Sequence, residues 1–95
     1  MKMLMLVYSG PNPQRVSSLL DQHASGYTEF PNVHGAGATG RREGTRAWPG
    51  ESSLFVTVVP QNQADDLVAT LGAESRQLPG GERLHLAVLP LETFF

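Results

Sequence analysis

SLFVTVV, residues 53–59, is the clearest strand in the sequence and decides the predicted fold. It is rich in the β-branched and aromatic residues that favour strands, and Pro60 ends it. Alternate residues of a strand point to opposite faces, so one face carries Phe55 and Val59. The residues between them are also apolar for the most part, so this strand has apolar side chains on both faces.

A helix is predicted directly after this strand. Its apolar residues recur at spacings of three and four, which is typical of one buried helix face. These residues are Ala64, Leu67, Val68 and Leu71. We expect Asn62 to cap this helix and Gly72 to end it. A turn at 77–81 then leads to a last strand at 84–89, which Pro90 stops.

The N-terminal half of the sequence repeats the same order of elements. An apolar run at 3–8 predicts a buried strand. A helix follows, with Asn12 as its expected cap and Pro13 at its first position. A second strand is expected over 27–34, where Pro31 requires a sheet edge or a bulge because it lacks an N–H.

Residues 35–51, GAGATGRREGTRAWPGE, separate the two halves. We expect a long loop here, because four glycines between 37 and 50 prevent any regular element. These are Gly37, Gly40, Gly44 and Gly50. Loops of this length are usually functional or disordered.

The order strand-helix-strand, long loop, strand-helix-strand predicts a single α+β domain over 1–95. It is the ferredoxin-like βαββαβ sandwich, in which an antiparallel four-stranded sheet carries two helices on one face. The other face of the sheet is left bare and is apolar. Such a face usually marks an interface, so we expect copies of the chain to pack sheet to sheet around a symmetry axis.

Composition excludes several other classes of protein. The 95 residues include no cysteine, which excludes disulfides and thiolate metal sites. A formal net charge of −2 does not suggest a nucleic-acid partner. No run is apolar for long enough to span a membrane, and no nucleophile elbow or HExxH motif is present. We therefore expect a cytoplasmic protein that is not an enzyme.

Residues 26–51 resemble the PII-like proteins, which are relatives of the nitrogen-regulatory PII signal-transduction proteins. The stretches that carry the resemblance are Gly26-Tyr27-Thr28, Gly35-Ala36-Gly37 and Gly44-Thr45-Arg46-Ala47-Trp48-Pro49-Gly50-Glu51. The opening residues 1–4 and the strand before Pro90 also fit, so the resemblance covers nearly the whole chain.

This resemblance implies a homotrimer with the sheets facing inward. Residues 36–51 would match the family's T-loop, which contacts a partner protein such as a membrane transporter. A small anionic ligand, such as an adenine nucleotide, would bind in the cleft between subunits, and its contact with the T-loop would change which partner is engaged.

The sequence departs from the classical PII pattern before its last strand. There the family has a glycine- and lysine-rich loop that holds phosphates, whereas 78–83 is shorter, has no lysine and contains Glu82. The segment 36–51 also lacks the tyrosine that is modified in classical members. The chain therefore fits better with the divergent PII-like branch, whose members respond to varied small ligands.

Two groups of residues are predicted to bind the ligand. Glycine backbone N–H groups form nests for anions, and arginine pairs with phosphate or carboxylate. The predicted residues are Gly35, Gly37, Arg41, Arg42, Arg46 and Trp48 in the long loop, and Gly80, Gly81 and Arg83 before the last strand. The alternatives are a solvated loop whose tryptophan only packs, and a tight turn with Gly80 and Gly81 at positive φ.

Two other functions remain open at this stage. One is a divalent-metal-binding or metal-tolerance module of the same fold, in which a trimer brings copies of His34 together and Glu29 or Glu43 joins them. No two histidines have a local ligand spacing, however. The other is an enzyme of the dimeric α+β barrel type, for which the sequence lacks a reactive constellation.

Overall fold

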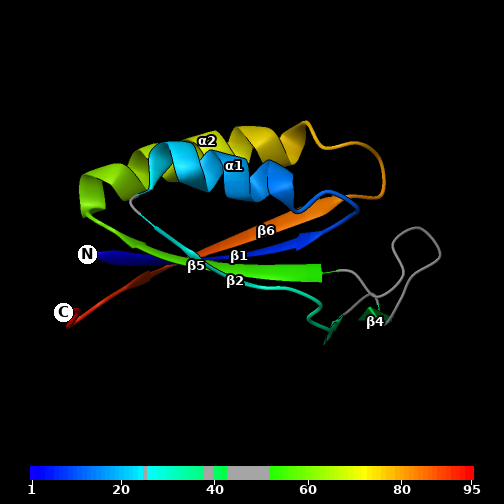
Figure 1. The fold of residues 1–95 in the computed structure, drawn as a ribbon, viewed down its shortest axis with the longest axis horizontal. Coiled ribbons are helices and arrows are strands. Elements are labelled where there is room, and N and C mark those ends of the chain that lie inside the picture. The colour runs from blue at the N-terminus through cyan, green and yellow to red at the C-terminus, as the bar shows by residue number, and fades with distance from the viewer. Residues whose placement is uncertain (25, 38–39, 43–51) are drawn as a thin grey trace.

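The computed structural model describes residues 1–24, 26–37, 40–42 and 52–95. In this part of the chain a four-stranded antiparallel sheet carries two helices on one face (Figure 1). Its elements are β1 (Lys2–Ser9), α1 (Gln14–His23), β2 (Thr28–Phe30), β5 (Ser52–Val59), α2 (Gln61–Arg76) and β6 (Arg83–Pro90). The predicted α+β, ferredoxin-like βαββαβ fold is confirmed.

Strand β1 lies inside the sheet, whose order is β2-β5-β1-β6. It pairs along its whole length with β5 and β6, so the ends of the three strands coincide. At one end Ser9 lies opposite Ser52 and Arg83, and we call this the loop end of the sheet. At the other end Lys2 lies opposite Val59 and Pro90, and we call this the terminal end.

The core lies between the sheet and the two helices. Every second residue of β1 points into it, and both Leu4 and Leu6 are fully buried. Phe55 and Val59 of β5 are buried on the same side, so the face of that strand that carries them is the covered one. The other buried apolar residues are Tyr8, Val16, Leu20, Ala64, Leu67, Leu71 and Leu84.

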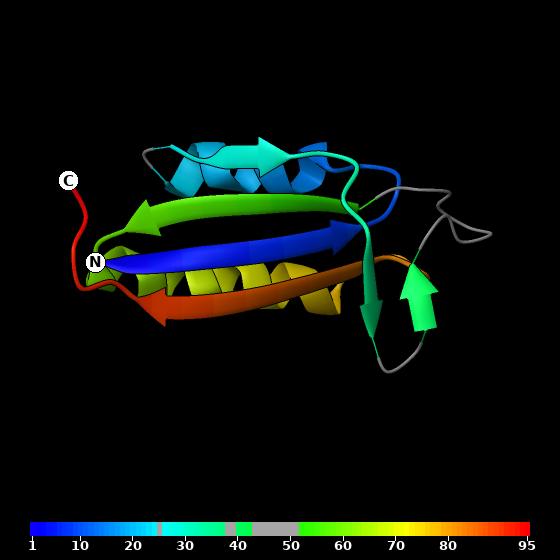
Figure 2. The ribbon, with the colours of Figure 1, turned by 90° about the horizontal axis from the view of Figure 1, so that it is seen from below.

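The opposite face of the sheet is apolar, and no described helix covers it (Figure 2). The register places its side chains in rows across the strands, because directly paired residues of neighbouring strands point to the same face. The rows are Phe30, Leu54, Val7 and His85; then Thr28, Val56, Met5 and Ala87; then Val58, Met3 and Leu89. We call these residues the uncovered face.

Strand β2 is shorter than the predicted strand over 27–34. It ends at Phe30, because Pro31 cannot donate to the ladder and Asn32 has a left-handed φ of 58°. The Val33 N–H then donates to the Ser52 carbonyl at 2.9 Å, which restores the pairing after a bulge. The expectation that Pro31 belongs at an edge or a bulge is confirmed, since β2 is an edge strand.

A small hairpin follows, where no regular element was expected. β3 (Gly35–Gly37) pairs antiparallel with β4 (Gly40–Arg42), and Gly35 lies opposite Arg42. That expectation was wrong for this part of 35–51, because ladder hydrogen bonds use only the backbone and glycine weakens a strand without forbidding it. The hairpin lies beyond the loop end and runs crosswise to the sheet strands (Figure 2).

Helix α1 begins without the predicted side-chain cap. Pro13 holds the cap position, and Asn12 makes no side-chain capping bond. Instead the Asn12 backbone N–H donates to the Tyr8 hydroxyl at 3.1 Å. The start of α1 is therefore fixed by β1 rather than by its own cap.

Helix α2 begins at Gln61, so Asn62 lies inside it and does not cap it. It also continues through Gly72 to Arg76, because an interior glycine costs only about 1 kcal/mol. Tertiary contacts outweigh this cost. Leu71 is buried, and the Ser75 hydroxyl donates to the Leu84 carbonyl of β6 at 3.2 Å.

We predict that Gly10→Ala lowers the free energy of unfolding by about 1–3 kcal/mol, the usual cost of overpacking. A Cβ at Gly10 would lie 2.7 Å from Tyr8 Cζ and 3.0 Å from Glu82 Cγ, so the Tyr8 ring has to move. Urea denaturation measures the loss. Gly80→Ala is the control, because a Cβ there meets no atom within 4 Å. Equal stability of the two variants would contradict the prediction.

Candidate functional site

The loop end of the sheet brings together segments that carry the described members of both groups of predicted ligand residues. β1 ends there at Ser9, β5 begins there at Ser52, and the turn that carries Gly80 and Gly81 enters β6 there at Arg83. The β3–β4 hairpin, which carries Gly35, Gly37, Arg41 and Arg42, lies beyond the same end (Figures 1 and 2). Segments far apart in sequence therefore meet at one end of the fold.

The turn before β6 is tight. Gly81 has a φ of 89°, and the Glu82 N–H donates to the Pro79 carbonyl at 3.1 Å. Only glycine adopts this φ without strain, so the alternative interpretation, a tight turn with positive φ, is confirmed for Gly81. It is wrong for Gly80, whose φ lies outside that region.

Glu82 points into the fold and not toward a ligand outside the turn. Its side chain is 5% exposed, and its carboxylate accepts a hydrogen bond of 2.7 Å from the Tyr8 hydroxyl. The Arg15 Nε lies 3.8 Å from the same oxygen. The acidic residue that departs from the classical phosphate loop is therefore buried beside an arginine.

Arg15 connects α1 to two other elements. Its Nη1 lies 3.4 Å from Glu74 Oε2 on α2, while its Nε is buried and has no hydrogen-bond acceptor among the described residues. Burial opposes the charge of Arg15, but the bond to Glu74 and the charge of Glu82 outweigh this effect and raise its pKa. We call Tyr8, Arg15, Glu74 and Glu82 the Arg15 network.

Tyr8 is the buried member of this network, with 1% of its surface exposed. Burial disfavours its phenolate, and donation to the negative Glu82 disfavours it further. The pKa of Tyr8 is therefore raised above its ordinary value of 10.0. The network holds the turn at 79–82 against β1, α1 and α2.

Arg83 is the basic residue that this turn presents to solvent. It is exposed, and it lies on the uncovered face together with His85, because alternate residues of β6 share a face. Its guanidinium belongs to the rim of that face. The Arg83 side chain can reach an anion at the edge of the uncovered face, or a neighbouring chain that packs on this face.

Several predicted residues are not brought into a defined geometry. Arg46 and Trp48 lie in 43–51, outside the described residues, and for Arg41 and Arg42 the structure defines the strand but not the side chains. His34 is exposed just before β3. The described residues contain no group of three or more histidines or acidic residues that could hold a metal ion, so the site at His34 stays a prediction without support.

Sequence reasoning missed the Arg15 network and the 2.8 Å hydrogen bond between the Ser9 and Ser52 hydroxyls. One sequence signal points to part of it. Tyr8 ends an apolar strand with a polar tip, and Gly10 follows two residues later. A buried tyrosine hydroxyl needs a partner, and a nearby glycine leaves room for the ring.

No protein-family model and no curated protein matches the sequence. Solved structures do match the fold. CPII from Thiomonas intermedia K12, a nitrogen regulatory PII-like protein bound to ADP, AMP and bicarbonate, has a TM-score of 0.65 at 22% identity, over 93% of this chain and 86% of that one. A PII-like signalling protein from Thermus thermophilus has a TM-score of 0.62 at 19% identity, over 92% of this chain and 82% of that one.

The chain therefore has the fold of the PII-like proteins, as the resemblance at 26–51 implied. CPII without ligand has the same fold, with a TM-score of 0.62 at 17% identity, over 93% of this chain and 87% of that one. Neither helix in the described part of the chain has the length and apolarity needed to cross a membrane.

We predict that Tyr8→Phe reduces the loss of stability above pH 10. Because its folded pKa is raised, Tyr8 keeps its proton in the folded state at pH values where the unfolded chain releases it. This part of the stability is complete below about pH 10 and is lost as the pH rises through the folded pKa of Tyr8.

Urea denaturation at a series of alkaline pH values measures this effect. The wild type loses stability more steeply than Tyr8→Phe. Tyr27→Phe is the control, because it removes a tyrosine hydroxyl and keeps the bond between Tyr8 and Glu82. Parallel curves for the wild type and Tyr8→Phe would contradict the assignment.

Proposed function

We propose that this chain is a divergent PII-like regulator that assembles as a trimer and binds a small anion, an adenine nucleotide in the first place, between its subunits. The observation that supports it most is the fold shared with CPII, a protein solved with ADP, AMP and bicarbonate. On this proposal the chain acts by binding and not by catalysis, as a cytoplasmic protein.

The uncovered face supports self-association. It runs across all four strands of the sheet, and on it Val7 is 36%, Leu89 39% and Phe30 47% exposed. Burying apolar surface contributes about 25 cal/mol per Å², so copies that pack through this face gain stability that a single subunit lacks. A chain of 95 residues has a thin core of its own, which makes this gain relatively large.

The geometry at the loop end supports a ligand site at the seam between subunits. Arg83 lies at the rim of the uncovered face, where a neighbouring subunit would begin, and Gly81 lies in the turn just before it. The Glu82 carboxylate turns inward, toward Tyr8 and Arg15, and away from the space outside the turn where a phosphate would bind. Arg83 then supplies the positive group, and the Arg15 network holds the turn in place for it.

The segment 36–51 is the counterpart of the T-loop on this proposal. Part of it forms the β3–β4 hairpin beyond the loop end, next to the proposed seam (Figure 1). Its three arginines, Arg41, Arg42 and Arg46, suit an acidic partner surface or the ligand itself. A membrane transporter is the partner that we propose.

We predict that ADP raises the melting temperature of the wild-type protein. At a ligand concentration of 100 times Kd, binding adds about 2.7 kcal/mol, which for a domain of this size corresponds to a shift of about 10 °C or more. ADP, AMP, ATP and bicarbonate are compared by differential scanning fluorimetry, and Kd for ADP is measured by calorimetry.

Arg83→Ala weakens ADP binding about tenfold or more, because it removes a charge-assisted hydrogen bond. Arg76→Ala is the control, an exposed arginine at the end of α2 on the helix side of the sheet. If none of the nucleotides shifts the melting temperature, the proposed ligand class is wrong. If the two variants bind ADP with equal affinity, Arg83 is not part of the site.

We predict that Val7→Asp on the uncovered face dissociates the assembly into single chains. A carboxylate placed between packed apolar faces would be desolvated without a partner. Sedimentation velocity measures the state of association, and far-UV circular dichroism shows whether the variant is folded. Ala69→Asp, at an exposed position of α2, is the control that keeps the assembly. A wild type that sediments as a single chain would contradict self-association.

A further inference from the structure

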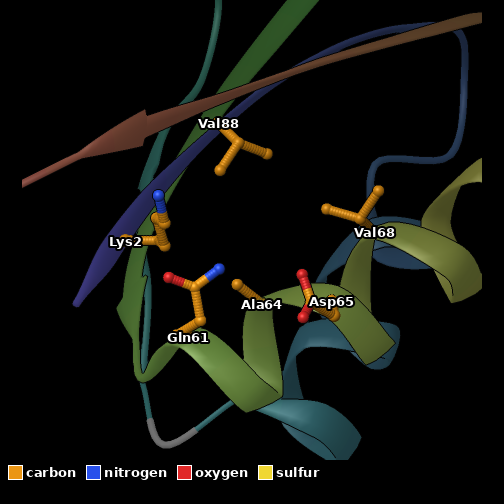
Figure 3. A pocket seen from close by; sticks show the side chains of 6 residues that line it. All are labelled: Lys2, Gln61, Ala64, Asp65, Val68 and Val88. Atoms are coloured by element: carbon orange, nitrogen blue, oxygen red, sulfur yellow. The ribbon is translucent and has the colours of Figure 1, made fainter.

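A groove of about 330 Å³ lies at the terminal end of the sheet, away from the proposed nucleotide site. It opens on the helix side of the sheet, beneath the first turns of α2. Its lining residues are Lys2 of β1, Val88 of β6, and Gln61, Ala64, Asp65 and Val68 of α2 (Figure 3). The volume is near the lower limit of ligand pockets, so the groove suits a small molecule.

The groove exists because α2 covers β1 but not the whole of β6. Val88 and Leu4 lie opposite each other in the register and share the helix side of the sheet. Leu4 is fully buried, whereas Val88 is 42% exposed. The apolar floor of the groove at Val88 is therefore left without an intramolecular cover in the described part of the chain.

Two opposite charges face this apolar floor without being paired. Lys2 reaches in from β1 and Asp65 from α2, on opposite sides of the groove (Figure 3). Within the described residues, neither side chain makes an ion pair or a hydrogen bond. The lining thus has an ammonium group at one side and a carboxylate at the other, and its apolar members are Ala64, Val68 and Val88.

We propose that this groove binds a small zwitterion with an apolar side chain, namely a free aliphatic α-amino acid. The ligand carboxylate pairs with the Lys2 ammonium, the ligand ammonium pairs with Asp65, and the Gln61 amide can donate to the carboxylate. The aliphatic side chain packs on Val68 and Val88. A lone anion or a lone cation satisfies only one of the two charged side chains, so the zwitterion is the better match.

This site is independent of the proposed nucleotide site, since the two lie at opposite ends of the sheet. An effector at the groove contacts the start of α2, and the far end of α2 carries Glu74 of the Arg15 network. The helix therefore connects the two sites physically.

A two-dimensional ¹H–¹⁵N NMR titration of the full chain with L-leucine tests the proposal. We expect saturable shifts centred on the groove residues. 4-Methylpentanoate, which lacks the ammonium, and isopentylamine, which lacks the carboxylate, each bind about tenfold or more weakly, because each loses one charge-assisted hydrogen bond. Leucine binding that is no tighter than that of either analogue would overturn the zwitterion assignment.

Lys2→Gln and Asp65→Asn each weaken leucine binding about tenfold or more. Asp66→Asn is the matched control, because Asp66 is exposed on the same helix, carries the same charge and does not line the groove. NMR shifts that do not saturate with leucine would overturn the site. An equal loss of leucine affinity in Asp65→Asn and Asp66→Asn would also overturn it. ADP binding by a protein that fails this test would leave the proposed function standing.

Discussion

The strands of this sheet are apolar on both faces, whereas within the described residues the two helices cover only one of them. Leu4 and Leu6 of β1 are fully buried under α1 and α2, while Met5 and Val7 between them point to the uncovered face. Exposure of apolar side chains to water is unfavourable on the second face just as it is on the first. The inference of assembly, and of a ligand seam at the edge of that assembly, depends on this imbalance.

On the proposed function, the Arg15 network is what lets a loop without lysines serve an anion. Glu82 looks unfavourable in the sequence, but the structure buries it against Tyr8 and Arg15. Its role is to anchor the turn, and Arg83 one residue later carries the exposed positive charge. The turn before β6 thus has a fixed backbone and one basic side chain at the rim of the uncovered face, as the proposed anion site requires.

Much of the fold could be predicted from local pattern. The apolar runs at 3–8 and 53–59 and the helical spacing from Ala64 to Leu71 identify the central strands and α2. The errors fall where long-range contacts override local preference. Gly72 does not end α2 because later residues of that helix bond to β6 and to Arg15, and the glycine-rich hairpin forms through backbone pairing alone.

The site was predictable only in outline. Glycine and arginine content singled out two segments that the fold brings to the loop end, but not which side chains face outward, and their role in binding stays a prediction. The direction of Glu82 depends on Arg15, which is distant in sequence, and no local pattern reports such a pair. The groove at the terminal end depends likewise on how α2 crosses β6, which spacing along the chain does not define.

Native mass spectrometry of the wild-type protein with ADP tests the central claim most directly, because it counts chains and nucleotides in the same particle. The account predicts a particle of three chains, each of 10.3 kDa, that carries bound nucleotide. A single chain without nucleotide, under conditions where the protein is folded, would contradict it.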